Sequence, residues 1–184
     1  LAFMGDMIFE KPLGRSKPVK SIIPYVNSLS FKDYENSNSG ESIKFGADVK
    51  LTIDNSLTLD LTINPDFSQV EVDQQVTNLT RYEVTLPEKR QFFIENSDLF
   101  SSFGNSKDAN PFFSRRIGIG KDLNGNSIEN KIDFGMRLSG KLNNNFRIGL
   151  LNMQTQEDIE NEIAATNNSI VALQHKVFNR SNVS

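Results

Sequence analysis

The stretch Ile43-Lys-Phe-Gly-Ala-Asp-Val-Lys-Leu-Thr-Ile53 alternates apolar and polar residues without a break. After the turn residues Asp54-Asn55-Ser56, the stretch Leu57-Thr-Leu-Asp-Leu-Thr-Ile63 does so again. Strict alternation is typical of a β-strand with one apolar and one polar face. A strand of a soluble protein averages ~5–6 residues, whereas a strand that crosses a bilayer needs ~9–11. The hairpin therefore fits an outer-membrane β-barrel, and it also fits a long hairpin of a soluble sandwich.

The same alternation returns in Ile132-Asp-Phe-Gly-Met-Arg-Leu-Ser139 and in Phe146-Arg-Ile-Gly-Leu150. Asn124-Gly125-Asn126 and Asn143-Asn144-Asn145 predict tight turns, and further strands are predicted over 22–31, 116–119 and 169–178. This makes about six or seven antiparallel strands, whereas a closed transmembrane barrel needs at least ~8. The predicted fold class is all-β: antiparallel strands of a transmembrane β-barrel, as an incomplete portion of a larger barrel.

Composition narrows the classes of function. Hydrophobic residues make up 37% of the chain and the mean hydropathy is -0.41. No segment offers the ~18 apolar residues of a spanning helix, which excludes a helical membrane protein but not a barrel, whose strands are only half apolar. The net charge of -3, with no basic stripe, gives a nucleic-acid role little support. With no cysteine, disulfides, thiolate metal sites and thiol nucleophiles are excluded.

Residues 64–116 interrupt the strand pattern with charged and aromatic side chains and no long alternation. We expect residues 1–20 to be a connector, 21–184 to be the barrel portion, and 64–116 to be an inserted plug or cap. A segment of this size without strands is usually functional. Its charged side chains are expected to form a network in the lumen, because a lipid-facing Arg or Lys costs ~2–4 kcal/mol at the midplane. The candidate network is Glu83, Glu88, Lys89, Arg90, Glu95, Arg115 and Arg116, either as a salt-bridge network without a ligand or as a binding site.

The strand alternation also predicts which side chains face which way. The lumen-facing set is Lys44, Asp48, Lys50, Asp60, Asp133, Arg137 and Arg147. The lipid-facing set is Phe45, Val49, Leu51, Leu59, Leu61, Phe134, Met136 and Leu138. His175, which is the chain's one histidine, shares a face with Val171, Leu173 and Val177 and is expected to pack rather than to bind a metal.

No catalytic, cofactor or metal site is predicted. The chain holds no Gly-x-Ser-x-Gly, His-Glu-x-x-His or phosphate-loop motif. Glu88 and Glu95 could form a glycosidase pair, but such pairs are defined by their separation in space.

Four stretches resemble one family: Leu57 to Asp73, Val76 to Glu83, Leu86-Pro-Glu-Lys-Arg-Gln-Phe-Phe-Ile-Glu-Asn-Ser-Asp-Leu-Phe100, and Phe112-Phe-Ser-Arg-Arg-Ile-Gly118. The family comprises large bacterial envelope proteins, common in Bacteroidetes, in which a carbohydrate-binding family 9-like domain precedes a DUF5916-type region. The resemblance implies an outer-membrane β-barrel but no established activity. Where the family has "Pro-Phe-Phe-Leu-Glu-Gly", this chain has Gln91 and Asn96. Asn96 tolerates the left-handed backbone that such a turn requires.

The sequence therefore predicts a non-enzymatic barrel segment in the bacterial outer membrane that acts as a pore or binding scaffold. Its expected partners are outer-membrane lipid, with glycans or other envelope proteins as candidates. A soluble all-β sandwich that binds carbohydrate is the alternative, and a carboxylate-based glycoside hydrolase is the weaker one. The apolar strand face separates the first two, since a barrel exposes it to lipid and a sandwich buries it against a second sheet.

Overall fold

The computed structural model describes residues 18–33, 38–54, 56–65, 87–101, 103, 111–125, 127–178 and 181–184. Most of the predicted connector 1–20 and a large part of the predicted insertion 64–116, including Glu83, lie outside the described residues. The described residues include nine strands and three short helical turns.

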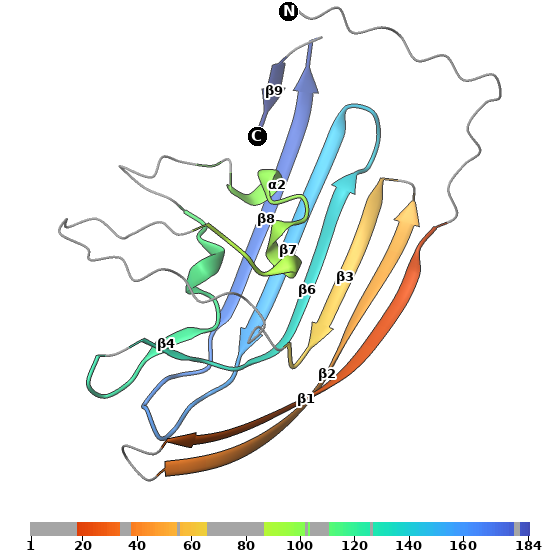
Figure 1. The fold of residues 1–184 in the computed structure, drawn as a ribbon. Helices are drawn as coiled ribbons and strands as arrows, with labels where there is room; N and C mark the ends of the chain where they lie inside the picture. The colour runs from red at the N-terminus through yellow and green to blue at the C-terminus, as the bar shows by residue number, and fades with distance from the viewer. Residues whose placement is uncertain are drawn as a thin grey trace, which may run out of the picture.

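Seven of these strands form one antiparallel sheet in which each strand pairs with the next along the chain (Figure 1). Long strands are expected where apolar and polar residues alternate. Four of the observed strands extend beyond their predicted bounds, the strand 57–63 has the predicted bounds, and the strand predicted over 169–178 spans 167–177. The strands are β1 (Lys20–Asp33), β2 (Asn38–Asp54), β3 (Leu57–Ile63), β6 (Ile132–Lys141), β7 (Phe146–Thr155), β8 (Asn167–Val177) and β9 (Ser181–Val183).

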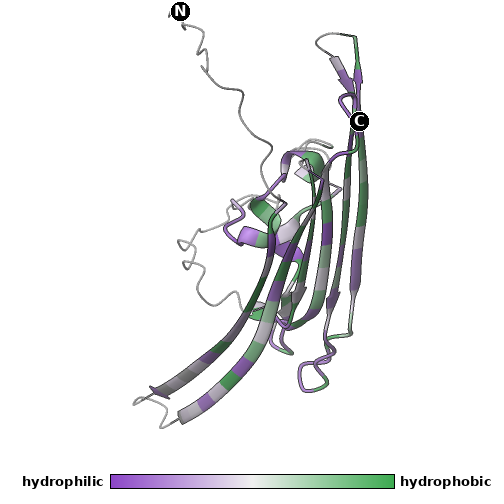
Figure 2. Cartoon of the chain, turned by 90° about the vertical axis from the view of Figure 1, so that its right-hand side faces the viewer, coloured by the Kyte–Doolittle hydropathy of each residue, from purple (hydrophilic) through white to green (hydrophobic). Residues whose placement is uncertain are grey.

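The connection from β3 to β6 carries the inserted elements. They are α1 (Gln91–Ile94), α2 (Asp98–Ser101), the 3-10 helix η1 (Ser114–Arg116), and a small hairpin of β4 (Ile119–Lys121) and β5 (Ser127–Glu129). Figure 2 shows the short helices on one side of the curved sheet. The insertion therefore covers one face of the sheet.

The predicted all-β antiparallel class is confirmed. Within the described residues the sheet is open, with β1 and β9 as its edge strands. Closure into a barrel stays a prediction.

The covered face is the polar one. Asp60, Thr62, Arg137 and Ser139 are buried there beneath the insertion, and Lys44, Lys50 and Arg147 reach residues of the insertion from the same face. Towards β7 and β8 this face becomes apolar and packs against the insertion's aromatic residues. The buried core is Phe93, Leu99, Phe100, Ile117, Ile132, Leu151, Met153 and Ala172.

The opposite face is apolar, and within the described ranges it is uncovered. None of the eight residues in the predicted lipid-facing set is buried, and Phe45 is 64% exposed. One register across this face joins Leu51, Leu59, Leu138, Leu150 and Val171. The alternation therefore assigns the two faces as the sequence predicts.

The start of β6 departs from that prediction. A register shift between Ile132 and Phe134 places Ile132 in the buried core, while Asp133 is exposed. A bulge adds a residue to one strand and changes which face each side chain takes. Asp133 therefore does not join the buried polar residues, contrary to the predicted lumen-facing set.

The strand predicted to resume at Arg116 is also wrong, since Arg115 and Arg116 lie in η1. Gly118 follows with φ of 83°, which interrupts an extended backbone. The extended segment begins only at Ile119.

Candidate functional site

A row of three charged side chains crosses the polar face of the sheet beneath α1. Lys50 on β2 lies opposite Asp60 on β3, and Asp60 lies opposite Arg137 on β6. The Arg137 Nη2 and Nε atoms donate to Asp60 Oδ2 at 2.7 and 3.2 Å, and Lys50 Nζ lies 3.7 Å from Asp60 Oδ1. The sheet thus presents two cations around one anion.

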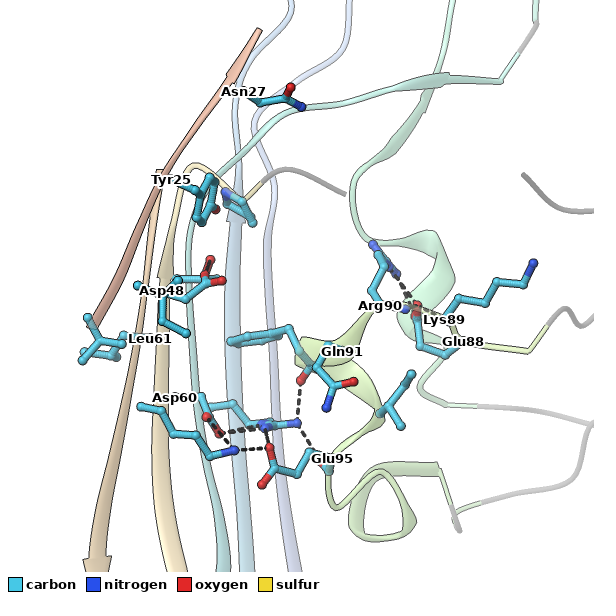
Figure 3. A pocket seen from close by; sticks show the side chains of 18 of the residues that line it. Tyr25, Asn27, Asp48, Asp60, Leu61, Glu88, Lys89, Arg90, Gln91 and Glu95 are labelled. Atoms are coloured by element: carbon cyan, nitrogen blue, oxygen red, sulfur yellow. Dashed lines mark hydrogen bonds and ion pairs between the residues drawn. The ribbon is translucent and has the colours of Figure 1, made fainter. Parts of the chain in front are cut away.

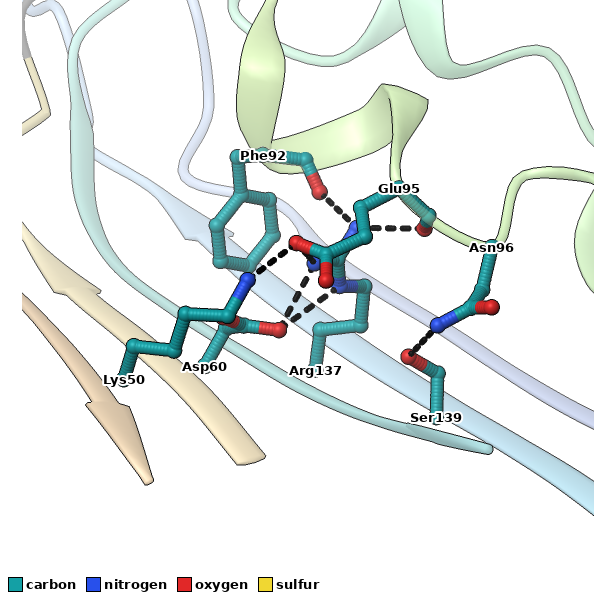
Figure 4. A network of polar contacts seen from close by, with 7 residues as sticks. All are labelled: Lys50, Asp60, Phe92, Glu95, Asn96, Arg137 and Ser139. Atoms are coloured by element: carbon teal, nitrogen blue, oxygen red, sulfur yellow. Dashed lines mark hydrogen bonds and ion pairs between the residues drawn. The ribbon is translucent and has the colours of Figure 1, made fainter. Parts of the chain in front are cut away.

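Glu95, which follows α1, supplies the second anion (Figure 4). Its carboxylate accepts a hydrogen bond from Lys50 Nζ, and its Oε2 atom lies 3.3 Å from Arg137 Nη2. Arg137 Nη1 also donates to the backbone oxygens of Phe92 and of Glu95, the latter at 2.6 Å. Arg137 is 1% exposed, so one buried guanidinium joins the sheet to the end of α1.

The turn after α1 fixes this arrangement. Asn96 adopts a left-handed backbone with φ of 52°, as its short amide side chain allows. Its Nδ2 atom donates to Ser139 Oγ at 3.0 Å. Asn therefore fills the position where the family pattern has glycine, and it adds a contact to the sheet that glycine cannot make.

A second polar cluster lies within the insertion. Glu88 and Arg90 form a bidentate ion pair, with Nε–Oε1 and Nη2–Oε2 distances of 2.9 and 2.8 Å. Ser114 Oγ donates to Glu88 Oε2 at 2.6 Å. Arg90 also donates to the backbone oxygens of Ser114 and Ile117, each at 2.7 Å, and its guanidinium lies 4.3 Å from the Phe93 ring centroid. This cluster joins residues 88–93 to residues 114–117.

A third contact anchors α2. Asp98, in the first turn of α2, pairs with Arg147 on β7 at Nη1–Oδ2 and Nη2–Oδ1 distances of 2.7 and 3.2 Å. The Asp98 side chain is 61% exposed. Exposed ion pairs contribute ~0.2–1 kcal/mol to stability. This ion pair therefore orients α2 on the sheet but adds little to the stability of the contact.

Three of the acidic residues in these clusters, Glu88, Glu95 and Asp98, have lowered pKa values. Burial alone would raise the pKa of Glu88 and of Glu95, but cationic partners outweigh it and lower both pKa values. For Glu88 the partners are Arg90 and the Ser114 hydroxyl, and for Glu95 they are Lys50 and Arg137. Hydrogen bonding from Arg147 lowers the pKa of Asp98.

The structure therefore divides the predicted network. Glu88 and Arg90 lie together, while Glu95 joins the charged row of the sheet instead. Lys89 donates its backbone N–H to Glu88, and Arg116 stacks at 5.8 Å from the Phe113 ring centroid. Arg115 is half-buried in η1. The pairing of Lys50 and Arg137 with Glu95 was not predicted, although both strand residues were expected on this face.

A cleft of about 990 Å³ lies between β1–β3 and residues 88–95 (Figure 3). The Tyr25 hydroxyl on its wall donates to the backbone oxygen of Asn64 at 3.3 Å, and Thr62 Oγ1 donates to Asp48 Oδ1 at 2.6 Å. Lys50, Glu95 and Arg137 line the same cleft. The charged row is thus accessible from a hollow of the size that small ligands occupy, lined by both apolar and polar residues.

Two absences hold for the described part of the chain. It contains no group of three or more His, Asp or Glu residues that could hold a metal ion. No helix within the described ranges is long and apolar enough to cross a membrane.

Fold and site together define an antiparallel β-sheet protein with a helical insertion clamped to its polar face. The chain belongs to the family described as "Domain of unknown function (DUF5916)", whose family model matches residues 18–179. This confirms the family to which the sequence motifs pointed. No match to the chain was found among curated proteins or among solved structures.

Proposed function

We propose that this chain is a non-enzymatic segment of an outer-membrane β-barrel in the envelope of a bacterium such as a member of the Bacteroidetes. Its apolar face contacts lipid, its polar face lines the lumen, and the insertion acts as a plug or cap. The barrel serves as a pore or binding scaffold, with glycans or envelope proteins as candidate partners. A carbohydrate-binding family 9-like domain precedes the barrel in the parent protein.

The observation that carries the proposal is the uncovered apolar face. In a water-soluble protein, a large contiguous exposed apolar patch marks a binding surface or a membrane contact. Here the polar face is the covered one and the apolar face is open, the arrangement expected of a barrel with lipid outside and a filled lumen inside. The exposed members span β1 to β8 and include Ile22, Val26, Ile43, Phe45, Ile63, Phe134, Met136, Val171 and Leu173.

The course of this apolar belt adds support. On β1 the belt runs from Ile22 to Val26 and centres on Pro24, and on β8 the same face carries Val171, Leu173, His175 and Val177, whose midpoint lies next to Leu173. The two centres are not in register. The register that starts at Pro24 continues through Ala47, Ile63, Phe134, Gln154 and Asn167.

The belt therefore shifts by six positions on β8, from Asn167 to Leu173, over five strand-to-strand steps. At ~3.3 Å per residue and ~4.8 Å between strands, this is about 20 Å along the strands for about 24 Å across them. The belt then crosses the register at an angle of about 40°. Strands of outer-membrane barrels tilt by ~35–45°, so a bilayer of uniform depth would trace such a diagonal.

The sandwich alternative requires a second sheet over the apolar face. Within the described residues the insertion covers the opposite face, and the sandwich stays the alternative to the barrel. The hydrolase alternative requires a carboxylic acid with a raised pKa as the proton donor. The pKa values of Glu88 and Glu95 are both lowered, which argues against these two residues as a glycosidase pair.

Membrane extraction of the parent protein tests the proposal. We expect it in the detergent-extracted outer-membrane fraction, with heat-modifiable migration on a gel. Val49→Arg places a charge in the middle of the belt on β2 and should reduce the heat-modifiable fraction, at a cost of ~2–4 kcal/mol. Glu41→Arg, on the same face of β2 but beyond the belt, is the matched control and should assemble normally. Extraction of the wild type into buffer as a soluble monomer would overturn the proposal.

A further inference from the structure

The Glu95 carboxylate lies against a place on the sheet where the strand side chains carry a net positive charge. The in-register row of Lys50, Asp60 and Arg137 carries two cations and one anion. Cross-strand neighbours of opposite charge attract, so Asp60 offsets one cation and leaves a net positive charge. The Glu95 carboxylate meets both cations at this place.

Glu95 comes from the insertion, not from the sheet, and its carboxylate is not enclosed. The Glu95 side chain is 34% exposed, whereas the side chain of Arg137 is 2% exposed. The row and Glu95 line the cleft beside β1–β3. A solute in the cleft can therefore reach the cations from the side on which the Glu95 carboxylate lies.

Displacement of the Glu95 side chain would leave α1 in place. Arg137 Nη1 donates to the backbone oxygens of Phe92 and Glu95, whereas Nη2 faces the carboxylates of Asp60 and Glu95. The two halves of the guanidinium thus have separate partners. One half holds the insertion by its backbone, and the other half can exchange one carboxylate for another.

We propose that the cleft binds small carboxylate-bearing solutes, whose carboxylate replaces that of Glu95 between Lys50 and Arg137. Without such a solute, the Glu95 carboxylate occupies the site, and it competes with anions that bind there with low affinity. Polar groups near the site, such as the exposed Gln91 and the Asp48–Thr62 pair, would contact the body of the solute. This inference goes beyond the scaffold role and does not depend on the chain's location in a membrane.

Propionate and propionamide are the probes, because they reproduce the side chains of Glu and Gln without the backbone. The readout is the Arg137 Nε–H resonance of the full-length purified protein during titration. A tethered group presents an effective concentration of millimolar or more. Removing it with Glu95→Gln should lower the propionate concentration at the midpoint by roughly tenfold or more.

Matched variants make the test specific. Asp98→Asn removes an ion pair of the same insertion but leaves the row intact, so its midpoint should equal that of the wild type. The double variant Lys50→Gln, Glu95→Gln should not show the lower propionate midpoint of Glu95→Gln, because one of the two cations is missing. Glu95→Ala has no amide to bond Arg137 and should lower the propionate midpoint at least as much as Glu95→Gln does. Amide protection of β6 and β7 establishes that each variant is folded.

Two results would overturn the inference. One is a midpoint in the folded Glu95→Gln and Glu95→Ala variants that equals that of the wild type. The other is a response to propionamide as large as the response to propionate. Either result would leave the row with a purely structural role.

Discussion

Asp60 and Arg137 lie directly opposite each other on neighbouring strands, although the whole insertion separates them in sequence. Their side chains meet at 2.7 Å, and the same guanidinium holds two backbone oxygens of the insertion. The residue that joins β6 to β3 thus also fixes the segment that connects them. Sheet pairing and insertion docking share one buried side chain.

Arg137→Met should destabilise both parts at once. It leaves Asp60 without its main partner and the carbonyls of Phe92 and Glu95 without a donor. Truncating one member of a buried ion pair costs roughly 3–5 kcal/mol. The measurement is the free energy of unfolding of the full-length protein in urea. Arg147→Met removes the exposed pair with Asp98 and is the control, with an expected loss below about 1 kcal/mol. Equal losses in the two variants would contradict this account.

Acidification should release the insertion before it unfolds the sheet. The pKa values of Glu88 and Glu95 are lowered in the folded state, so their contribution to stability is complete above the ordinary carboxyl pKa of ~4.3. It is lost as the pH falls from there through the folded-state pKa values. Amide protection of residues 88–101, corrected for intrinsic exchange, should decrease in that range while that of β6 and β7 persists.

The doubly substituted Glu88→Gln, Glu95→Gln protein is the control for this effect. Its insertion should be less protected at neutral pH and should show little further change on acidification. A variant that retains the wild-type pH dependence would assign the transition to other carboxyls.

Gly149→Ala should disturb the docking of α2. A Cβ atom at Gly149 would lie 2.8 Å from the ring of Phe100, and Phe100 is buried in the core. Overpacking of this kind costs typically ~1–3 kcal/mol. Urea unfolding measures the loss, and Phe100→Leu in the same chain should recover part of it. Gly125→Asn is the control, because nothing lies within 4 Å of that site and Asn tolerates its φ of 83°.

Because the apolar belt crosses the strands diagonally, residues that share a register should lie at different depths in the bilayer. Spin labels at Pro24 and Leu173 should report the same depth in a bilayer. A label at Asn167, which shares the register of Pro24, should lie outside the hydrocarbon. Accessibility to oxygen and to a polar nickel complex measures these depths. Equal depths for Pro24 and Asn167 would contradict the tilt.

The alternation along each strand made the sheet and its two faces predictable from the sequence. Successive side chains of a strand point to opposite faces. Once the strand is recognised, Phe45 and Lys44 are therefore assigned to opposite faces of the sheet. The same rule fails at Ile132, because a bulge changes the count without a signal in the apolar pattern. Strand β9 was missed, since three exposed residues show no periodicity.

The partners within the site were less predictable. The motif Glu88-Lys89-Arg90 indicates charged chemistry, and the Glu88–Arg90 pair is local. Glu95 instead pairs with Lys50 and Arg137, each more than forty residues away. Such pairing depends on strand register, which the alternation does not specify. A search for opposite charges at matching positions of neighbouring strands would have found the row of Lys50, Asp60 and Arg137.

The insertion leaves the sheet after Ile63 and returns to it at Phe134, and these two residues are direct partners. In terms of chain order, everything between them is therefore the loop of one very long hairpin. Strands β3 and β6 can pair in the same register whatever that loop contains. The order of the strands therefore does not depend on the insertion, and a short turn in place of the loop would leave that order unchanged.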